Sequence, residues 1–234
     1  YGHVEIAQQS PDEFLADIRR AKDLLEQITG EQVKGYRAPD FSIVRKTLWA
    51  FDALAEAGFE YDSSIVPVRL VRYGIPDWPV QPAHVRLANG RTILEAPLAT
   101  FRCFGKNWPV GGGGYHRLLP GFVSRSLARN VMGAAPFVFY CHPYEFDARE
   151  LEEIPLRVPL TVRLHQGAGR RYFESRFVSF VRDFGGQRVQ DLLSSRYWPE
   201  IDLHAFSLDS SSKQISGIGD LLRPEEPRCP ARPE

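Results

Sequence analysis

Hydrophobic positions in the first third of the chain follow helical and strand periods in turn. The segment Ser10-Pro11-Asp12-Glu13 is typical of a helix start, because its serine can cap the first turn and its glutamate can close a capping box. β-Prone segments at 33–36 and 59–61 enclose a second predicted helix at 42–58, and this alternation favours an α/β fold with parallel strands. The first helix is predicted to end at Gly30 and to bury one apolar stripe, formed by Phe14, Ile18, Ala21, Leu25 and Ile28.

The most apolar segment, residues 137–142, runs directly into a histidine and a proline. A near-continuous apolar run of this length predicts a strand that is buried on both faces, as in a parallel sheet. Pro143 cannot donate to a sheet ladder, so the strand is predicted to end at His142. This places His142 at the carboxyl end of a strand, the edge at which parallel α/β folds carry their catalytic residues.

The remaining segments predict further helices, a long loop and the end of the domain. Further helices are predicted at 120–132 and 170–183, whereas residues 66–91 contain four prolines without any period, which favours a long loop. Serine and proline dominate after Ile201, so residues 201–234 are predicted to form a disordered tail that does not pack. Residues 1–200 are then expected to form one domain.

The balance of charged residues argues against two classes of binding partner. The chain has 29 Lys and Arg residues against 29 Asp and Glu residues, which disfavours nucleic acid and anionic membranes as partners. No apolar run is long enough to span a membrane and no secretory signal is visible, so we expect a cytoplasmic protein. The chain starts at Tyr1 and not at a methionine, so we also expect an N-terminally truncated sequence. Nothing in the pattern predicts an oligomeric state.

Three polar residues each follow a predicted strand. Arg37, Asp62 and His142 would share one rim if these strands are parallel. The combination suits acid–base hydrolysis, in which the carboxylate orients the imidazole, the imidazole protonates a leaving group and the arginine holds a second carboxylate. A surface Arg–Asp pair beside an unrelated histidine is the alternative interpretation.

A run of four glycines, Gly111–Gly114, is typical of a loop that lets the backbone come close to another group. Tyr115 and Arg117 follow this run and are candidate contacts to a ligand. Glu95, together with Tyr144 and Glu145 just after the predicted strand end, could line the same site, although packing in the core or in a loop explains each of them equally well.

The chain as a whole resembles a polysaccharide deacetylase of the NodB-homology type (carbohydrate esterase family 4), most closely the branch encoded with exosortase and exopolysaccharide loci. The resemblance spans roughly residues 1–198, and the order and spacing of its pieces make it specific. The pieces are Gly2-His3, Gly35–Ile43, Tyr61–Pro67, Arg72–Asp77, Gly111–Pro120 and Tyr140–Asp147.

This resemblance implies an irregular, TIM-like (β/α)7 barrel, incomplete at its N-terminus, that removes N-acetyl groups from an N-acetylated polysaccharide such as an exopolysaccharide or a peptidoglycan-like glycan. It also implies a divalent metal ion, usually Zn²⁺. His3 matches the second histidine of the metal-binding H-x-x-x-H motif, and Arg37 matches the arginine that holds the catalytic base. The backbone N–H of Asp40 matches the oxyanion donor, and His142 matches the general acid.

The chain also departs from the family pattern. The aspartates and the first histidine of the family's metal and base set would precede Tyr1, so the chain is expected to bind metal poorly and to hydrolyse little, as an inactive fragment. Two alternatives stay open. One is a hydrolase of cyclic amides or imides, similar to allantoinase, on the same barrel, and the other is a non-catalytic protein that binds a carbohydrate or a partner.

Overall fold

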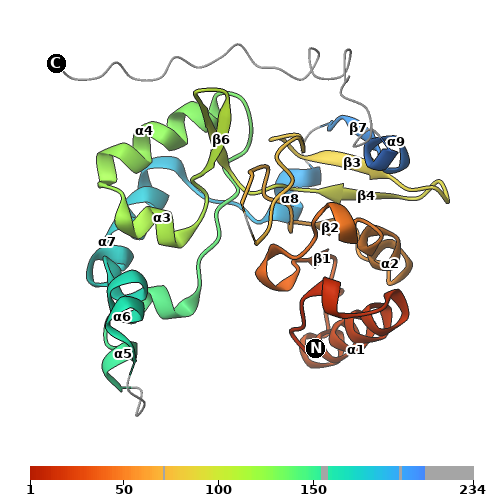
Figure 1. The fold of residues 1–234 in the computed structure, drawn as a ribbon, viewed down its shortest axis with the longest axis horizontal. Coiled ribbons are helices and arrows are strands. Elements are labelled where there is room, and N and C mark those ends of the chain that lie inside the picture. Colours follow the sequence, from red (N-terminus) through yellow and green to blue (C-terminus); the bar gives the residue numbers. More distant parts are fainter. Residues whose placement is uncertain (71, 154–157, 195–196, 209–234) are drawn as a thin grey trace.

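A computed structural model describes residues 1–70, 72–153, 158–194 and 197–208 as a mixed α/β fold (Figure 1). Its main sheet has five strands in the order β1-β2-β4-β3-β7, in which β1, β2 and β4 run parallel and β3 is antiparallel to β4. The sheet is open, with β1 and β7 at its two edges. The strands are β1 (Gly35–Tyr36), β2 (Tyr61–Asp62), β3 (Ala83–Arg86), β4 (Thr92–Glu95) and β7 (Glu200–Asp202), and a separate hairpin joins β5 (Thr100–Cys103) to β6 (Lys106–Pro109).

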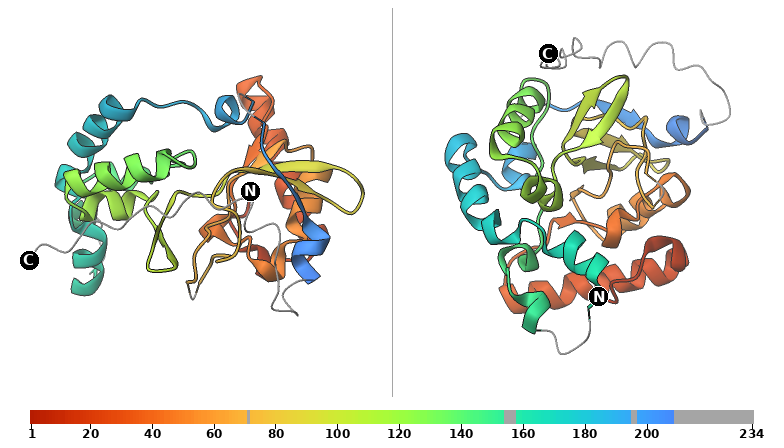
Figure 2. Two further views of the ribbon diagram at one scale, coloured as in Figure 1. Left: turned by 90° about the horizontal axis from the view of Figure 1, so that it is seen from above. Right: turned by 60° about the vertical axis from the view of Figure 1, so that its left-hand side comes forward.

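The helices form two groups. Figures 1 and 2 show α1, α2 and α9 beside the main sheet, whereas α3 to α7 gather on the other side of the β5–β6 hairpin. No helix in the described ranges is long and apolar enough to cross a bilayer. The bounds are α1 (Pro11–Thr29), α2 (Ala50–Glu56), α3 (Gly113–Leu118), α4 (Gly121–Met132), α5 (Glu150–Glu153), α6 (Leu160–Gly167), α7 (Arg170–Phe184), α8 (Val189–Ser194) and α9 (Leu203–Leu208), with 3-10 turns η1 (Ile6–Gln8), η2 (Pro39–Phe41), η3 (Arg45–Thr47) and η4 (Pro143–Phe146).

Helix α1 confirms the start signal in the sequence. The Ser10 side chain accepts a hydrogen bond from the Glu13 N–H, and Glu13 accepts one in return from the Ser10 N–H, so the capping box is complete. The predicted apolar stripe is correct only in its first half. Phe14 and Ile18 are buried in the core, whereas Ile28 near the end of α1 is 72% exposed.

The predicted buried strand at 137–142 is wrong. This segment is extended, but its only sheet-like contact in the described chain is an isolated bridge between Gly112 and Tyr140. The apolar side chains find their partners in helix α7, where the Phe139 ring centre lies 5.5 Å from that of Phe177 and 6.1 Å from that of Phe180. Packing against a helix therefore half-buries the Phe139 side chain without a sheet ladder.

The predicted start of the tail is also wrong. Residues 201–208 contribute to β7 and α9, and Leu203 is buried in the core between α1, α2 and the sheet. The Phe206 ring contacts the buried Trp78 edge-on, with ring centres 4.9 Å apart. Apolar residues therefore continue the domain beyond the expected boundary at 200, and residues 209–234 of the predicted tail lie outside the described residues.

Candidate active site

The carboxyl ends of β1, β2 and β4 meet at one edge of the sheet. The strand register places Tyr36 opposite Asp62 and Asp62 opposite Glu95. Arg37 follows β1 directly, so it emerges at the same edge. The predicted placement of Arg37 and Asp62 on a shared rim is confirmed by this register.

Asp62 is fully buried and anchors the segment that follows β1. Its Oδ2 accepts a hydrogen bond from the Ser64 N–H at 3.0 Å, and its Oδ1 accepts one from the Ser64 hydroxyl at 2.7 Å. The same hydroxyl accepts a hydrogen bond from the Ala38 N–H at 2.7 Å. Asp62 therefore acts through Ser64 on the backbone beside Arg37, and the expected contact between Asp62 and the His142 imidazole is not formed.

Arg37 is held by the neighbouring strand end. Its Nε donates to the Ser63 carbonyl and its Nη2 donates to the Ser63 hydroxyl, both at 2.7 Å. The Ser63 hydroxyl in turn donates to the Ala96 carbonyl at 2.6 Å, just after β4. These bonds connect the ends of three adjacent strands and fix the direction of the guanidinium.

Glu95, which the sequence predicted as a candidate to line the site, lies at this edge of the sheet. It is fully buried beside Asp62, and its Oε1 accepts a hydrogen bond from the Ile65 N–H at 2.9 Å. Burial, with Asp62 as its near neighbour, raises the pKa of the Glu95 carboxyl well above its usual range, and burial also raises the pKa of Asp62. A glutamate inside the apolar run Ile93-Leu94-Glu95-Ala96 was the available signal.

Tyr140 lies between Arg37 and His142. The Arg37 guanidinium carbon lies 5.9 Å from the centre of the Tyr140 ring. The His142 ring packs edge-to-face against the same ring, with ring centres 5.6 Å apart. His142 is exposed and stacks on Tyr144 with ring centres 4.8 Å apart. The predicted residues Arg37, His142 and Tyr144 thus lie around one aromatic side chain.

The loop after Arg37 has a strained backbone. Asp40 and Phe41 have φ angles of 51° and 54°, in the left-handed region that a bulky residue such as Phe41 rarely adopts. Phe41 is held there by its contact with Tyr140, with ring centres 4.8 Å apart. The Asp40 carboxylate forms an exposed ion pair with Arg72 at 3.0 Å, while the Asp40 backbone N–H has no acceptor within the described part of the chain. Strain of this kind is typical of functional loops.

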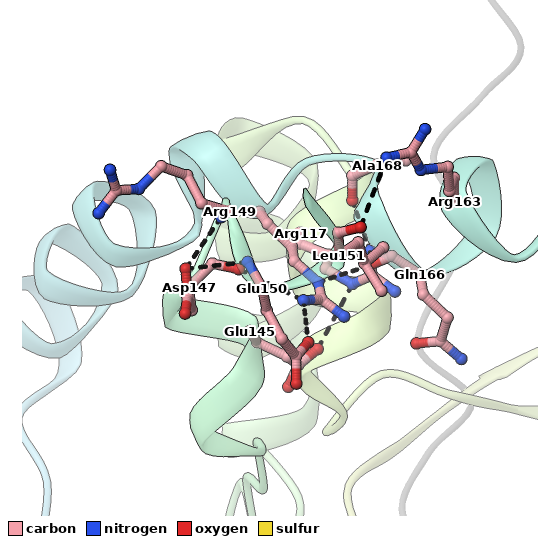
Figure 3. A network of polar contacts seen from close by, with 10 residues as sticks. Arg117, Glu145, Asp147, Arg149, Glu150, Leu151, Arg163, Gln166 and Ala168 are labelled. Carbon is pink, nitrogen blue, oxygen red and sulfur yellow. Dashed lines mark hydrogen bonds and ion pairs between the residues drawn. The ribbon is translucent and has the colours of Figure 1, made fainter. Parts of the chain in front are cut away.

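Arg117 and Glu145 form a buried ion pair. The Arg117 Nε lies 3.4 Å from the Glu145 Oε1, and the side chains are only 4% and 2% exposed. Arg117 also donates to the carbonyls of Gln166 and Ala168 (Figure 3). The Glu145 Oε2 accepts a hydrogen bond from the His142 N–H at 3.0 Å. Both side chains therefore bind within the fold, and their burial contradicts the predicted contact with substrate.

Tyr115 is better placed for that role. Its ring packs against Gly112, where a Cβ atom would lie 3.2 Å from the Tyr115 Cδ2 and 3.0 Å from the Tyr140 Cε1. Its side chain is 37% exposed, so it borders the Tyr140 side of the site while keeping an open face. The glycine run thus brings two aromatic rings close to the backbone.

The expected metal ligand, His3, lies near the start of the chain. It is exposed, in a segment that is held to α1 because the Tyr1 amino group and the Gly2 N–H both bind Asp17, at 2.8 and 2.7 Å. Among the described residues no group of three or more His, Cys, Asp or Glu side chains could hold a metal ion. A zinc site uses three or four protein ligands, more than the described residues bring together, so these residues do not fit the predicted ion.

Two comparisons with known proteins found a match. A family model described as a domain of unknown function, DUF3473, matches residues 63–194, which is more than half of the chain. No curated protein matches the sequence. The crystal structure of a Mycobacterium smegmatis protein, assigned as a polysaccharide deacetylase, aligns with all of this chain at 18% identity and a TM-score of 0.44. The chain spans 65% of that protein's length.

Proposed function

The chain belongs to the DUF3473 family, which is associated with polysaccharide deacetylase-like proteins, and we propose that it hydrolyses N-acetyl groups of an N-acetylated polysaccharide. The observation that supports this activity most directly is the grouping of Arg37, His142 and the Asp40 N–H around Tyr140 and Phe41. Exposed tyrosines beside a few polar groups are typical of sites that take a sugar ring. An exopolysaccharide or a peptidoglycan-like glycan is the proposed substrate class.

The proposed reaction is amide hydrolysis. Water adds to the acetyl carbon, the Asp40 N–H donates to the developing oxyanion, and protonated His142 gives its proton to the departing sugar nitrogen as the C–N bond breaks. Acetate and a free amine are the products. The proton that the attacking water loses goes to the solvent, and His142 takes one proton back from the solvent after the amine has left, so the cycle balances.

The test is acetate release from N-acetylated oligosaccharides by the wild-type protein and by His142→Ala. We expect the substitution to lower kcat by about 100-fold or more, because general acid catalysis commonly contributes that much. His204→Ala removes another exposed imidazole, on α9, and is expected to leave the rate unchanged. A wild-type protein that releases no acetate would overturn the proposed activity, and an unchanged rate in His142→Ala would overturn the assigned acid.

A carbohydrate-binding module is the second candidate, favoured by the exposed Tyr115. Tyr115 keeps exposed ring surface beside Tyr140 and could stack on a sugar without any chemistry. Calorimetric titration with the same oligosaccharides separates the two functions. Binding without acetate release supports the module, whereas turnover supports the hydrolase.

A further inference from the structure

We propose that Glu95 is a positioning residue, a neutral buried carboxylic acid whose O–H donates to the Asp62 carboxylate and so fixes the loop that carries Arg37 and Asp40. This inference deepens the proposed function and rests on it for the effect on catalysis. The arrangement of the buried pair itself stands on the geometry of the sheet edge.

The pairing follows from the strand register. Asp62 and Glu95 are the last residues of the adjacent parallel strands β2 and β4 and lie opposite each other, both with no exposed surface. The Glu95 Oε2 is buried and has no hydrogen-bond donor among the described residues, which leaves the neighbouring Asp62 carboxyl as the partner it can bond to. Two carboxylates cannot share a hydrogen bond unless one of them carries a proton.

The neighbours decide which group keeps the proton. Asp62 already accepts two hydrogen bonds from Ser64, whereas Glu95 accepts one from the Ile65 N–H and its Oε2 has no donor in the described structure. Hydrogen bonds from donors favour the charged form of a carboxyl, so the two Ser64 bonds favour a charged Asp62, whereas burial and the Asp62 charge raise the pKa of Glu95. Glu95 is therefore the donor and Asp62 the acceptor.

Other titratable groups around the pair agree with a single negative charge. Arg37 is the cation that lowers the pKa of both carboxyls, and its single positive charge balances one negative charge. Tyr36, opposite Asp62 in the sheet, is largely buried, and this burial together with the Asp62 charge raises the pKa of its hydroxyl. A second buried carboxylate would have no cation of its own, and an unpaired charge in such a place is costly.

The loop geometry gives this proton a role. Asp62 holds the Ser64 hydroxyl, and that hydroxyl accepts the Ala38 N–H between Arg37 and the strained residue Asp40. If Glu95 lost its proton, repulsion would push the Asp62 carboxylate away from this contact. Catalysis should then depend on Glu95 although it touches no substrate.

The experiment compares wild-type protein, Glu95→Gln and Glu95→Leu. Unfolding is measured in denaturant between pH 5 and pH 8, and acetate release is measured over the same range. The glutamine amide can replace the O–H donor without a titrating proton, whereas leucine has a similar volume and no donor. Glu60→Gln, at an exposed position before β2, is the matched control.

The raised pKa of Glu95 sets the sign of the stability effect. The folded wild-type protein keeps one proton that the unfolded chain releases above pH 4.5, the ordinary value of this carboxyl, so its stability falls as pH rises until the folded-state pKa is passed. The unfolding equilibrium constant of the wild type should rise about tenfold per pH unit relative to Glu95→Gln. Glu60→Gln should keep the wild-type slope.

Activity gives the second readout. We expect Glu95→Gln to keep the wild-type kcat within about threefold, and Glu95→Leu to lower kcat about tenfold or more with KM nearly unchanged. Equal pH slopes for wild type and Glu95→Gln, or a glutamine variant as impaired as the leucine variant, would overturn the inference. The slopes are measurable without turnover, so an inactive wild type would refute the proposed function alone.

Discussion

Replacing Glu145 by alanine is expected to lower the free energy of unfolding by about 3–5 kcal/mol, because it breaks a buried ion pair by removing one of the two partners. Both side chains are almost fully buried in the wild type. The alanine also removes the acceptor of the His142 N–H, which fixes the first turn of η4. The measurement is denaturant unfolding at neutral pH.

Glu153→Ala is the matched control. Glu153 is 62% exposed and pairs with Arg149 on the surface of α5, so its removal should change the free energy of unfolding by less than about 0.5 kcal/mol. A loss of the same small size in Glu145→Ala would mean that the pair contributes little. Since Glu145 holds the His142 backbone, the variant should also place the imidazole less accurately and reduce acetate release.

Local signals in the sequence predicted the parts of the fold that depend on neighbours along the chain. The capping box of α1 needs only Ser10 and Glu13, which are three residues apart, and the structure contains it. The alternation of helices and short strands predicted parallel β1 and β2, and hence the shared rim of Arg37 and Asp62. Both features follow from spacing alone.

The features that the sequence did not predict depend on distant segments. The run 137–142 has the composition of a buried strand, but its phenylalanine Phe139 packs against the α7 phenylalanines and not in a ladder. Glu95 meets Asp62 because β4 pairs with β2 across 33 residues of chain, a register that no local pattern contains. Arg117 follows the glycine run and Glu145 follows the predicted strand end, which makes both candidates for a ligand contact, whereas here they form a buried ion pair.

A substitution in the glycine run Gly111–Gly114 is expected to change the free energy of unfolding by a large amount at one position and little at another, because the four glycines have different surroundings. A Cβ atom at Gly111 would lie 2.4 Å from the Val138 carbonyl oxygen and 3.0 Å from the Ala99 nitrogen. Both are backbone atoms of the junction at which Ala99 N–H donates to Val138. Gly111→Ala must therefore separate these segments, and we expect a loss of about 2–3 kcal/mol in the free energy of unfolding, as for an overpacked core.

Gly114→Ala tests the same substitution three residues further along, inside α3. A Cβ atom there meets nothing within 4 Å, and alanine favours a helix by up to about 1 kcal/mol over glycine, so this variant should be slightly more stable than the wild type. Thermal unfolding of both variants measures the difference. If the two shifts have the same sign, the run acts as a flexible linker. Opposite signs show that Gly111 is required by the close approach of the segment that leads to His142.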